Sequence, residues 1–207
     1  MGSASPGWAA AGMPTAAAAP VSVLDLPEPP SFAEARMQLA SLTAAPESDV
    51  PGYSRAKFPH WITQSGTCDT REVVLQRDGK GVTQDDQCRS VAGSWVSAYD
   101  GAVLDGASKV DIDHVVPLKE AWRSGASQWA TGRRRAFAND LQRSQLIAVS
   151  ARSNRAKGDK DPARWQPDLD SYHCTYARAW ISVKADYALT TNQEEHDALT
   201  SMLDTCA

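Results

Sequence analysis

The chain has 207 residues, of which 42% are hydrophobic and 22% are charged, and its formal net charge is −4. A chain of this length can bury one good core but hardly two, so we expect a single domain over residues 31–207. The sequence contains no stretch of about eighteen apolar residues, which argues against a membrane span and against a membrane as partner.

The first segment, residues 1–30, is dominated by Ala, Pro, Gly and Ser. This composition cannot bury enough apolar surface to offset the entropy of ordering, so it predicts a disordered arm. The segment has no charged stretch followed by an apolar one, and we therefore expect that a signal peptide is not part of this sequence.

A short helix is predicted from Ser31 to Leu42, because apolar residues recur there at helical spacing. Ser31 is placed to cap this helix, and Glu34 is placed to complete a capping box. Turn-forming residues dominate from 46 to 59. The stretch 68–75 fits either a brief helix or a strand, since its periodicity covers too few residues to decide.

The middle of the chain predicts short elements. Gly, Asp and Ser are frequent over 78–108, which indicates irregular β-structure and turns. We expect helical residues at 121–124, a stronger helix over 133–141 and a strand over 146–149. A helix that opens at residues 153 and 154 should weaken or end at Gly158.

Two helices are predicted in the C-terminal segment, where Tyr, Trp, Ala and Leu repeat at spacings of three and four from residue 172 onward. Thr191 and Asn192 supply the cap between them. Burial in the core is a better explanation of these aromatic residues than a stacking platform for bases.

The four cysteines are Cys68, Cys88, Cys174 and Cys206, and none of them forms a Cys-x-x-Cys motif. Three pairings are possible, and local closure favours Cys68 with Cys88 and Cys174 with Cys206. Disulfides persist in oxidising compartments, so we expect an exported protein. The alternative is four free buried thiols in a cytoplasmic protein.

The most informative stretch runs from residue 111 to residue 117 and reads Asp-Ile-Asp-His-Val-Val-Pro. Its β-branched residues predict a strand, which Pro117 ends. Because alternate side chains of a strand share a face, Asp111 and Asp113 should point one way and His114 the other. Taken alone, an Asp-His pair is more often a surface ion pair or a half-buried histidine than a catalytic site.

Three further stretches extend this pattern: Phe-Ala-Asn-Asp-Leu at 137–141, Leu-Ile-Ala-Val at 146–149 and Ser-Asn-Arg-Ala-Lys at 153–157. A strand with Asp-His, a middle Asn, a second strand and a helix with Asn and Lys three apart resembles the HNH, or His-Me finger, endonucleases. The resemblance is greatest to secreted bacterial HNH endonuclease-like proteins. It covers residues 109–165 and implies a ββα-metal finger. Together with the helices and disulfides predicted above, we expect an α+β fold in which this finger is enclosed by flanking helices and stapled by two disulfides.

The resemblance also implies roles for individual residues. It assigns Asp113 and Asn154 as metal ligands, His114 as the general base, and Asn139 as the residue that fixes the loop so that His114 points at its water. An Asn ligand, where many of these enzymes have His, gives an all-oxygen ligand set, which favours Mg²⁺, with Mn²⁺ as the alternative, over zinc or nickel. Asp111 is expected to support the metal indirectly or through water.

Several basic residues are candidates for phosphate contacts. Lys157 lies one helical turn beyond Asn154 and could meet the scissile phosphate, with a solvated surface charge as the alternative. Arg71 could bind phosphate while Glu72 orients it, and a structural pair between them is the alternative.

Positive charge gathers around the candidate site, since residues 109–165 contain twelve Lys or Arg against six Asp or Glu. These basic residues, Arg152 and Arg155 among them, could follow a nucleic-acid backbone without reading its sequence. A solvated helix face is the alternative explanation.

We therefore expect a secreted, monomeric, metal-dependent endonuclease with little sequence specificity that hydrolyses DNA, with RNA as a second candidate substrate. The family implies a 5′-phosphate product. The alternative is a non-catalytic extracellular binding module in which the segment around Asp111 and Asp113 holds a structural ion.

Overall fold

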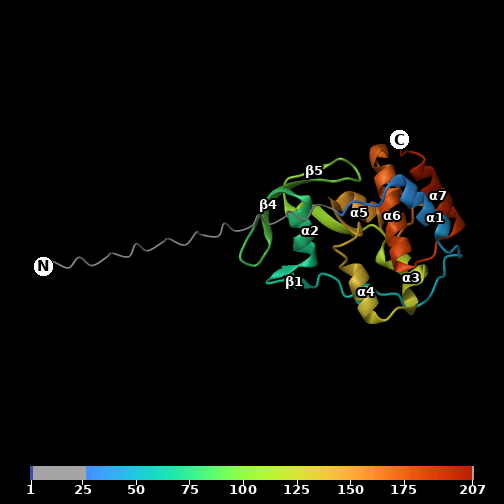
Figure 1. Cartoon of the computed structure of the whole chain (residues 1–207), viewed down its shortest axis with the longest axis horizontal. Helices are drawn as coiled ribbons and strands as arrows, with labels where there is room; N and C mark the ends of the chain where they lie inside the picture. Colours follow the sequence, from blue (N-terminus) through green and yellow to red (C-terminus); the bar gives the residue numbers. More distant parts are fainter. Residues whose placement is uncertain (2–26, 207) are drawn as a thin grey trace.

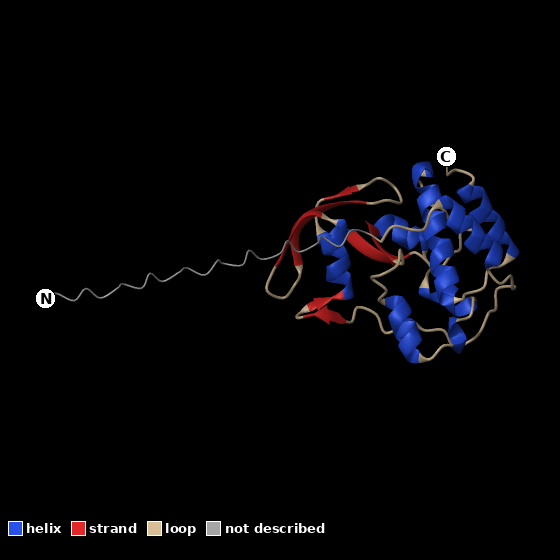
Figure 2. Ribbon diagram, in the orientation of Figure 1, coloured by secondary structure: helices blue, strands red, loops and turns tan. Residues whose placement is uncertain are grey.

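The computed structural model describes Met1 and residues 27–206. Within that part of the chain, most helices gather on one side and the small sheets lie on the other, together with helix α2 (Thr70–Asp78) (Figures 1 and 2). The fold is α+β, as expected. Of the helices in the described residues, none is long and apolar enough to cross a membrane.

Most of the predicted N-terminal arm, residues 2–26, lies outside the described residues. Residues 27–30 differ from the prediction, because they are docked on the domain. Pro29 is buried, and Arg178 donates hydrogen bonds to the carbonyls of Pro29 and Pro30 at 2.9 and 2.6 Å. A guanidinium group thus satisfies backbone carbonyls that have no partner in a helix or sheet, and residues 27–30, which the prediction assigned to the arm, belong to the packed domain.

The helical side of the molecule is built from α1 (Phe32–Ser41), α6 (His173–Tyr187) and α7 (Gln193–Leu203), which pack against one another (Figure 1). The predicted caps are confirmed. Ser31 and Glu34 form the capping box of α1, and the Asn192 side chain accepts from the Glu195 amide at 2.9 Å at the start of α7.

Both predicted disulfides are present. The bond between Cys174 and Cys206 joins the beginning of α6 to the end of the chain after α7, which holds the two helices antiparallel. The bond between Cys68 and Cys88 joins strand β2 (Cys68–Asp69) to the turn before strand β4 (Ser90–Val96). The aromatic residues of α6 lie in the core, as expected, with Tyr176 and Trp180 fully buried.

A buried ionic cluster supports the helical side. The Lys184 ammonium group contacts carboxylate oxygens of Glu120 at 2.9 Å and of Glu195 at 2.5 Å, and all three side chains are inaccessible to solvent. Glu120 lies on α3 (Leu118–Arg123), so the cluster connects that helix to α6 and α7. Trp180 donates a further hydrogen bond to Glu195 at 2.6 Å.

The opposite side carries two small antiparallel sheets. One contains β1 (Thr63–Ser65) and β2 (Cys68–Asp69), and the other contains β3 (Lys80–Gln84), β4 (Ser90–Val96) and β5 (Val103–Leu104). The undecided stretch 68–75 is thus a short strand followed by α2, which Asp69 caps by accepting from the Glu72 amide at 2.9 Å. Single 3₁₀ turns occur at Arg55–Lys57, Ala107–Lys109, Ala126–Gln128 and Asp170–Tyr172.

Strand β6 (Val110–His114) lies between these two sides and pairs with β7 (Leu146–Ser150) in antiparallel register, with Asp113 opposite Ile147. Helix α5 (Ala151–Lys157) follows β7 directly and packs on both strands. It begins earlier than predicted, because the Ser150 hydroxyl caps it by accepting from the Ser153 amide at 3.1 Å. Gly158 ends it with φ +58°, a conformation that favours glycine.

Helix α4 (Thr131–Ala138) ends earlier than the predicted residue 141. The Asn139 side chain donates to the carbonyl of Arg135 at 2.7 Å and also binds a distant loop. These contacts satisfy the last turn and lead the chain away from the helix axis, so the apolar spacing of Leu141 does not reflect a continued helix.

Asp100 fixes the start of α5 from outside the β6–β7 pair. Its carboxylate accepts hydrogen bonds from the hydroxyls of Ser150 and Ser153 at 2.7 and 2.9 Å, and its side chain is only 1% exposed. Burial raises the pKa of Asp100, but the hydrogen bonds from serine hydroxyls lower it by more, so the pKa lies well below its ordinary value.

Replacing Asp100 with Asn should destabilise the protein at neutral pH by about 2 kcal/mol, because hydrogen bonds to a buried charge are lost. A lowered pKa means that this carboxylate contributes stability above its unfolded pKa of about 3.9 and loses it as the pH falls through the lower folded value. Urea unfolding of the parent and of Asp100→Asn should be measured from about pH 7 to about pH 2.5. The difference between their free energies of unfolding should become smaller as the pH falls.

Asp168→Asn is the matched control. Arg152 pairs with both carboxylates, at 3.1 Å from Asp100 and 3.2 Å from Asp168, but the Asp168 side chain is 62% exposed. An exposed pair of this kind contributes less than about 1 kcal/mol. A stability difference for Asp100→Asn that stays constant down to low pH would contradict the role given to the ionised carboxylate.

Candidate active site

Two carboxylates of β6 face two side chains of α5. The Asn154 side-chain amide donates to Asp111 Oδ2 at 3.0 Å, and Lys157 Nζ lies 3.1 Å from Asp113 Oδ1 and 2.8 Å from Asp113 Oδ2. Asp111 and Asp113, two apart on the strand, therefore each contact one of two side chains that lie three apart on the helix. As predicted, Asp111 and Asp113 share one face of the strand.

The pair of Asp113 and Lys157 is buried, with side-chain exposures of 6% and 0%. Burial raises the pKa of Asp113 and lowers the pKa of Lys157, while each charge favours the ionised form of the other. Two more groups hold this pair in place. The Tyr99 hydroxyl donates to Asp113 Oδ2 at 2.7 Å, and Lys157 donates to the His114 carbonyl at 2.9 Å.

The side-chain oxygen of Asn154 is free to bind a ligand. Because its Nδ2 group donates to Asp111, its Oδ1 atom points elsewhere, and that atom accepts no hydrogen bond from any residue that the structure describes. Asp111 therefore orients an amide oxygen that remains available for a ligand.

His114 points to the other face of β6, as predicted. Its Nε2 atom lies 3.0 Å from the carbonyl of Ala138, and a carbonyl can only accept, so Nε2 carries the proton and Nδ1 is left as the acceptor. Burial lowers the pKa of His114 to about 3, which keeps the imidazole neutral at neutral pH. The ring stacks on Trp61, with 5.6 Å between centroids.

Asn139 holds the loop beside His114. Its Nδ2 group donates to the Pro59 carbonyl at 2.7 Å, and its Oδ1 atom accepts from the Ile62 amide at 3.1 Å and from the Thr70 hydroxyl at 2.7 Å. The loop between Pro59 and Ile62 carries Trp61, whose φ of +55° is unusual for a bulky residue. Asn139 thus fixes Trp61, and the neighbouring Ala138 carbonyl fixes the imidazole directly.

These groups border one pocket of about 320 Å³. Asp113, His114 and Asn154 line it from β6 and α5, Arg55 lines it from the 3₁₀ turn at 55–57, and Lys119 lines it from α3. The pocket therefore brings together carboxylate and amide oxygens, a neutral imidazole and two cations, which is a set of groups that can bind and hydrolyse a phosphate ester.

The oxygen donors can be compared with what a divalent ion requires. No cluster of three or more His, Cys, Asp or Glu side chains suited to a metal occurs among the described residues. Mg²⁺ needs fewer protein ligands than that, since it keeps several waters and is bound through one or two protein oxygens together with substrate phosphate. The free Oδ1 of Asn154 and the carboxylate of Asp113, in one pocket, fit this requirement.

The predicted basic residues are placed differently from one another. Lys157 is fully buried and paired, so it is neither the solvated surface charge that was the alternative nor open to a phosphate in this conformation. Arg71 binds Glu72 at 2.7 Å and donates to backbone carbonyls of Ala107 and Val110, which is the structural alternative.

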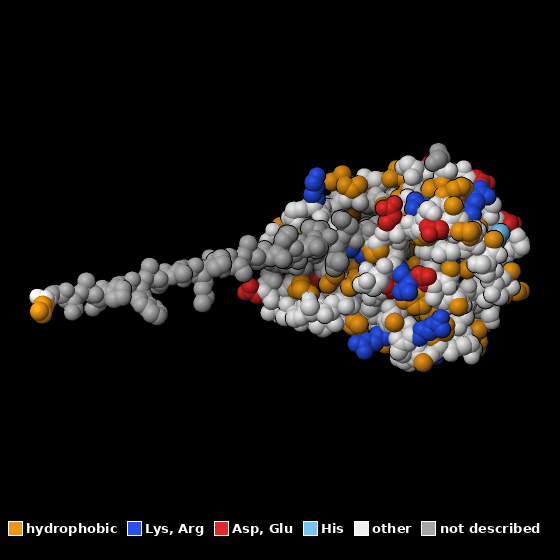
Figure 3. All heavy atoms as spheres, viewed as in Figure 1, with side chains coloured by type: hydrophobic (Ala, Val, Ile, Leu, Met, Phe, Trp, Pro, Cys, Tyr) orange, Lys and Arg blue, Asp and Glu red, His pale blue; other side chains and the backbone are white. Residues whose placement is uncertain are grey.

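Arg152 and Arg155 lie on α5 but do not line the pocket. Arg152 is 74% exposed and pairs with Asp100 and Asp168, whereas Arg155 is exposed. On the face shown in Figure 3, Lys and Arg side chains are scattered among Asp and Glu side chains and do not form one continuous patch. The charge excess seen in the sequence is therefore partly neutralised by acidic neighbours.

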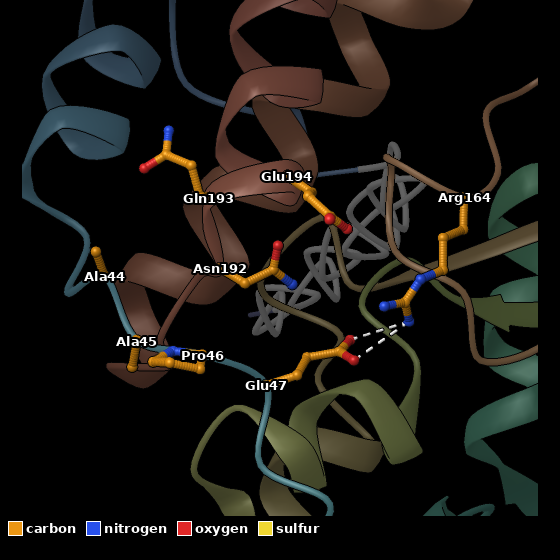
Figure 4. Close-up of a pocket in the computed structure, with 8 residues that line it drawn as sticks. All are labelled: Ala44, Ala45, Pro46, Glu47, Arg164, Asn192, Gln193 and Glu194. Atoms are coloured by element: carbon orange, nitrogen blue, oxygen red, sulfur yellow. Dashed lines mark hydrogen bonds and ion pairs between the residues drawn. The ribbon is translucent and has the colours of Figure 1, made fainter.

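A second pocket, of about 470 Å³, lies between residues 44–47, Arg164 and the start of α7 (Figure 4). Its two central charges neutralise each other, since Arg164 Nη1 lies 3.2 Å from Glu47 Oε2. None of the residues that line it is a predicted site residue, so we place the candidate active site in the smaller pocket.

Sequence reasoning missed Tyr99, Trp61 and Arg55, which lie 14 or more positions before Asp113 in the sequence and reach the site only through tertiary packing. Two weak signals were available, namely the aromatic residues around Pro59 and the isolated Arg in a turn-rich stretch. Neither signal points to a particular partner.

The chain is similar to a secreted fungal protein. Over 192 residues the chain is 55% identical to a protein of Arthroderma benhamiae named "Uncharacterized secreted protein", covering 93% of this chain and 94% of that protein. That relative is fungal, so the expected similarity to bacterial proteins is not confirmed. No solved structure matches the chain.

The name of the relative and the two disulfides confirm the expected extracellular location. Residues 71–202 match a nuclease family, and this match includes β6, β7, α5 and both pairs that join them. The match supports a nuclease-related protein and, through it, a nucleic acid as substrate. The chain belongs to the family of the C-terminal domain of GmrSD restriction endonucleases.

Proposed function

We propose that the protein is a secreted, metal-dependent endonuclease of the HNH type that hydrolyses phosphodiester bonds of DNA, and of RNA as a second substrate, with little sequence specificity. The observation that carries this proposal is the shared pocket of Asp113, His114 and Asn154, in which His114 is held as a neutral imidazole with Nδ1 free to accept a proton. We further propose that the β6–β7–α5 unit is a ββα-metal finger and that the protein acts as a monomer.

Asp113 and the Asn154 amide oxygen would hold the divalent ion, Mg²⁺ or, as the alternative, Mn²⁺. When bound, such an ion neutralises charge on the phosphate and stabilises the leaving oxygen. Asp111 holds the Asn154 amide group through Nδ2 and leaves its oxygen free, and Tyr99 and Lys157 keep the Asp113 carboxylate in place.

His114 would accept the proton of the attacking water at Nδ1. The Ala138 carbonyl fixes the tautomer that makes this possible, and the stacked Trp61 ring restricts rotation of the imidazole. Asn139 acts through this frame as a positioning residue, because it binds the loop that carries Trp61 and makes no hydrogen bond to His114 in the described structure.

Plasmid DNA should be degraded with Mg²⁺ and remain intact in EDTA. His114→Ala should lower turnover by about 10²-fold or more, the scale expected for a lost general base, and leave metal affinity nearly unchanged. Asn154→Ala should instead weaken Mg²⁺ binding, and excess Mg²⁺ or Mn²⁺ should recover part of its rate. Nicking rates and calorimetric titrations on both variants separate these effects.

His173→Ala is the matched control, since the His173 ring also binds a backbone carbonyl, that of Pro167 at 2.8 Å, but lies outside the pocket. Its turnover should stay near that of the parent protein. A near-normal rate in His114→Ala would exclude the general-base role. Metal binding by a parent protein that cuts no nucleic acid would indicate the non-catalytic binding module instead.

The buried pair gives a second test of the metal site. Lys157→Met leaves the Asp113 carboxylate without its counter-charge and should destabilise the metal-free protein by about 3–5 kcal/mol. If Asp113 is a ligand, Mg²⁺ then supplies the missing positive charge, so the Mg²⁺-induced rise in melting temperature should be larger in Lys157→Met than in the parent.

The double variant Lys157→Met/Asp113→Asn removes both charges and serves as the control. It should lose the enlarged response to Mg²⁺, which differential scanning fluorimetry with and without the ion measures. Equal Mg²⁺ responses in the parent, the single variant and the double variant would move the metal site away from Asp113.

A further inference from the structure

Arg55 lies in the wall of the candidate active site, although it is far from the finger in sequence. It begins the 3₁₀ turn at 55–57 and lines the same pocket as His114 and Asn154.

Arg55 differs from the neighbouring cations because it has no acidic partner among the described residues. Lys119, in the same pocket, contacts Asp159 at 2.9 Å, and Lys157 contacts Asp113 at 2.8 Å. Arg55 makes no ion pair with any carboxylate of the described residues, and its hydrogen bond goes to His60. A cation that lines a pocket without an acidic partner is suited to an anionic ligand.

The guanidinium group is held in a defined direction. Arg55 Nε donates to His60 Nε2 at 3.1 Å, and this is possible because His60 Nδ1 donates to the Phe58 carbonyl at 2.9 Å. Phe58 is fully buried against Trp122 and Phe137, which anchors the segment in the core. Both Nη groups of Arg55 then lack partners among the residues that the structure describes, which leaves the fork that matches two phosphate oxygens.

We propose that Arg55 binds a phosphate group of the nucleic-acid substrate in this pocket and that His60 positions it. This inference rests on the proposed nuclease function and adds to it a contact that belongs to neither the metal ligands nor the base. The ligand is a phosphodiester, which the planar guanidinium recognises through charge and paired hydrogen bonds without reading a base.

Two measurements test this contact. The first is fluorescence anisotropy of a labelled single-stranded oligonucleotide and of a short duplex in EDTA, over a series of NaCl concentrations, so that binding is observed without metal or cleavage. The second is the rate of oligonucleotide cleavage in Mg²⁺, resolved into kcat and KM. The variants are Arg55→Ala, Arg55→Lys, His60→Ala and the control Lys80→Ala.

Arg55→Ala should weaken oligonucleotide binding by about tenfold and reduce the slope of log K against log[salt] by about one ion. Arg55→Lys keeps the charge but not the fork, so it should keep the salt slope and recover only part of the affinity. His60→Ala should also keep the salt slope, because it removes orientation and not charge. Lys80 is exposed on β3 and outside the pocket, so Lys80→Ala should behave like the parent protein.

The outcomes separate this proposal from the nuclease function. A parent protein that cleaves DNA, together with Arg55→Ala and Lys80→Ala variants that are alike in affinity, salt slope and KM, overturns the role of Arg55 and leaves the nuclease function intact. A parent protein that neither binds nor cleaves nucleic acid overturns both. Loss of affinity in Arg55→Ala without cleavage by the parent supports the phosphate contact and contradicts the hydrolytic function.

Discussion

The site depends on one constraint, that a carboxylate buried at Asp113 must be paired. Lys157, in the last turn of α5, supplies the positive charge that pairs with Asp113, and the two side chains are almost completely removed from solvent. An unpaired charge at this depth would cost several kcal/mol, so the pair fixes how far α5 can slide or turn on β6. With that register fixed, Asn154 comes to lie opposite Asp111, and its amide oxygen is left free of hydrogen bonds within the described residues while the residue lines the pocket.

Three residues from two other segments hold the remaining sides of the β6–β7–α5 unit in place. Asp100 binds the serine hydroxyls at the start of α5, Tyr99 binds the Asp113 carboxylate, and Asn139 binds the loop that carries Trp61. Each contact is a hydrogen bond to a charged group or to backbone, and each comes from outside the strands and helix that it supports. The candidate site is therefore preorganised by the whole domain, which two disulfides and the ionic cluster at Lys184 stabilise further.

The pocket combines groups of opposite charge from several elements. Oxygen donors come from β6 and α5, and the cations Arg55 and Lys119 come from the 3₁₀ turn and α3. His114 contributes a neutral nitrogen, because its burial disfavours the charged form, while its bond to the Ala138 carbonyl fixes the tautomer. Under the proposed function the oxygen ligands bind the metal ion and the cations attract the phosphate, while the imidazole stays unprotonated.

The sequence by itself determined the local features. Helical spacing and capping residues located α1 and α7, short loops favoured the two disulfide pairings, and strand alternation placed Asp111 and Asp113 opposite to His114. Only the tertiary structure decided that Lys157 is buried and that Tyr99, Trp61 and Arg55 belong to the site. The physical reason is that periodicity and caps act within a few residues of chain, whereas the partner of a buried charge or an aromatic ring is set by which distant segments pack together.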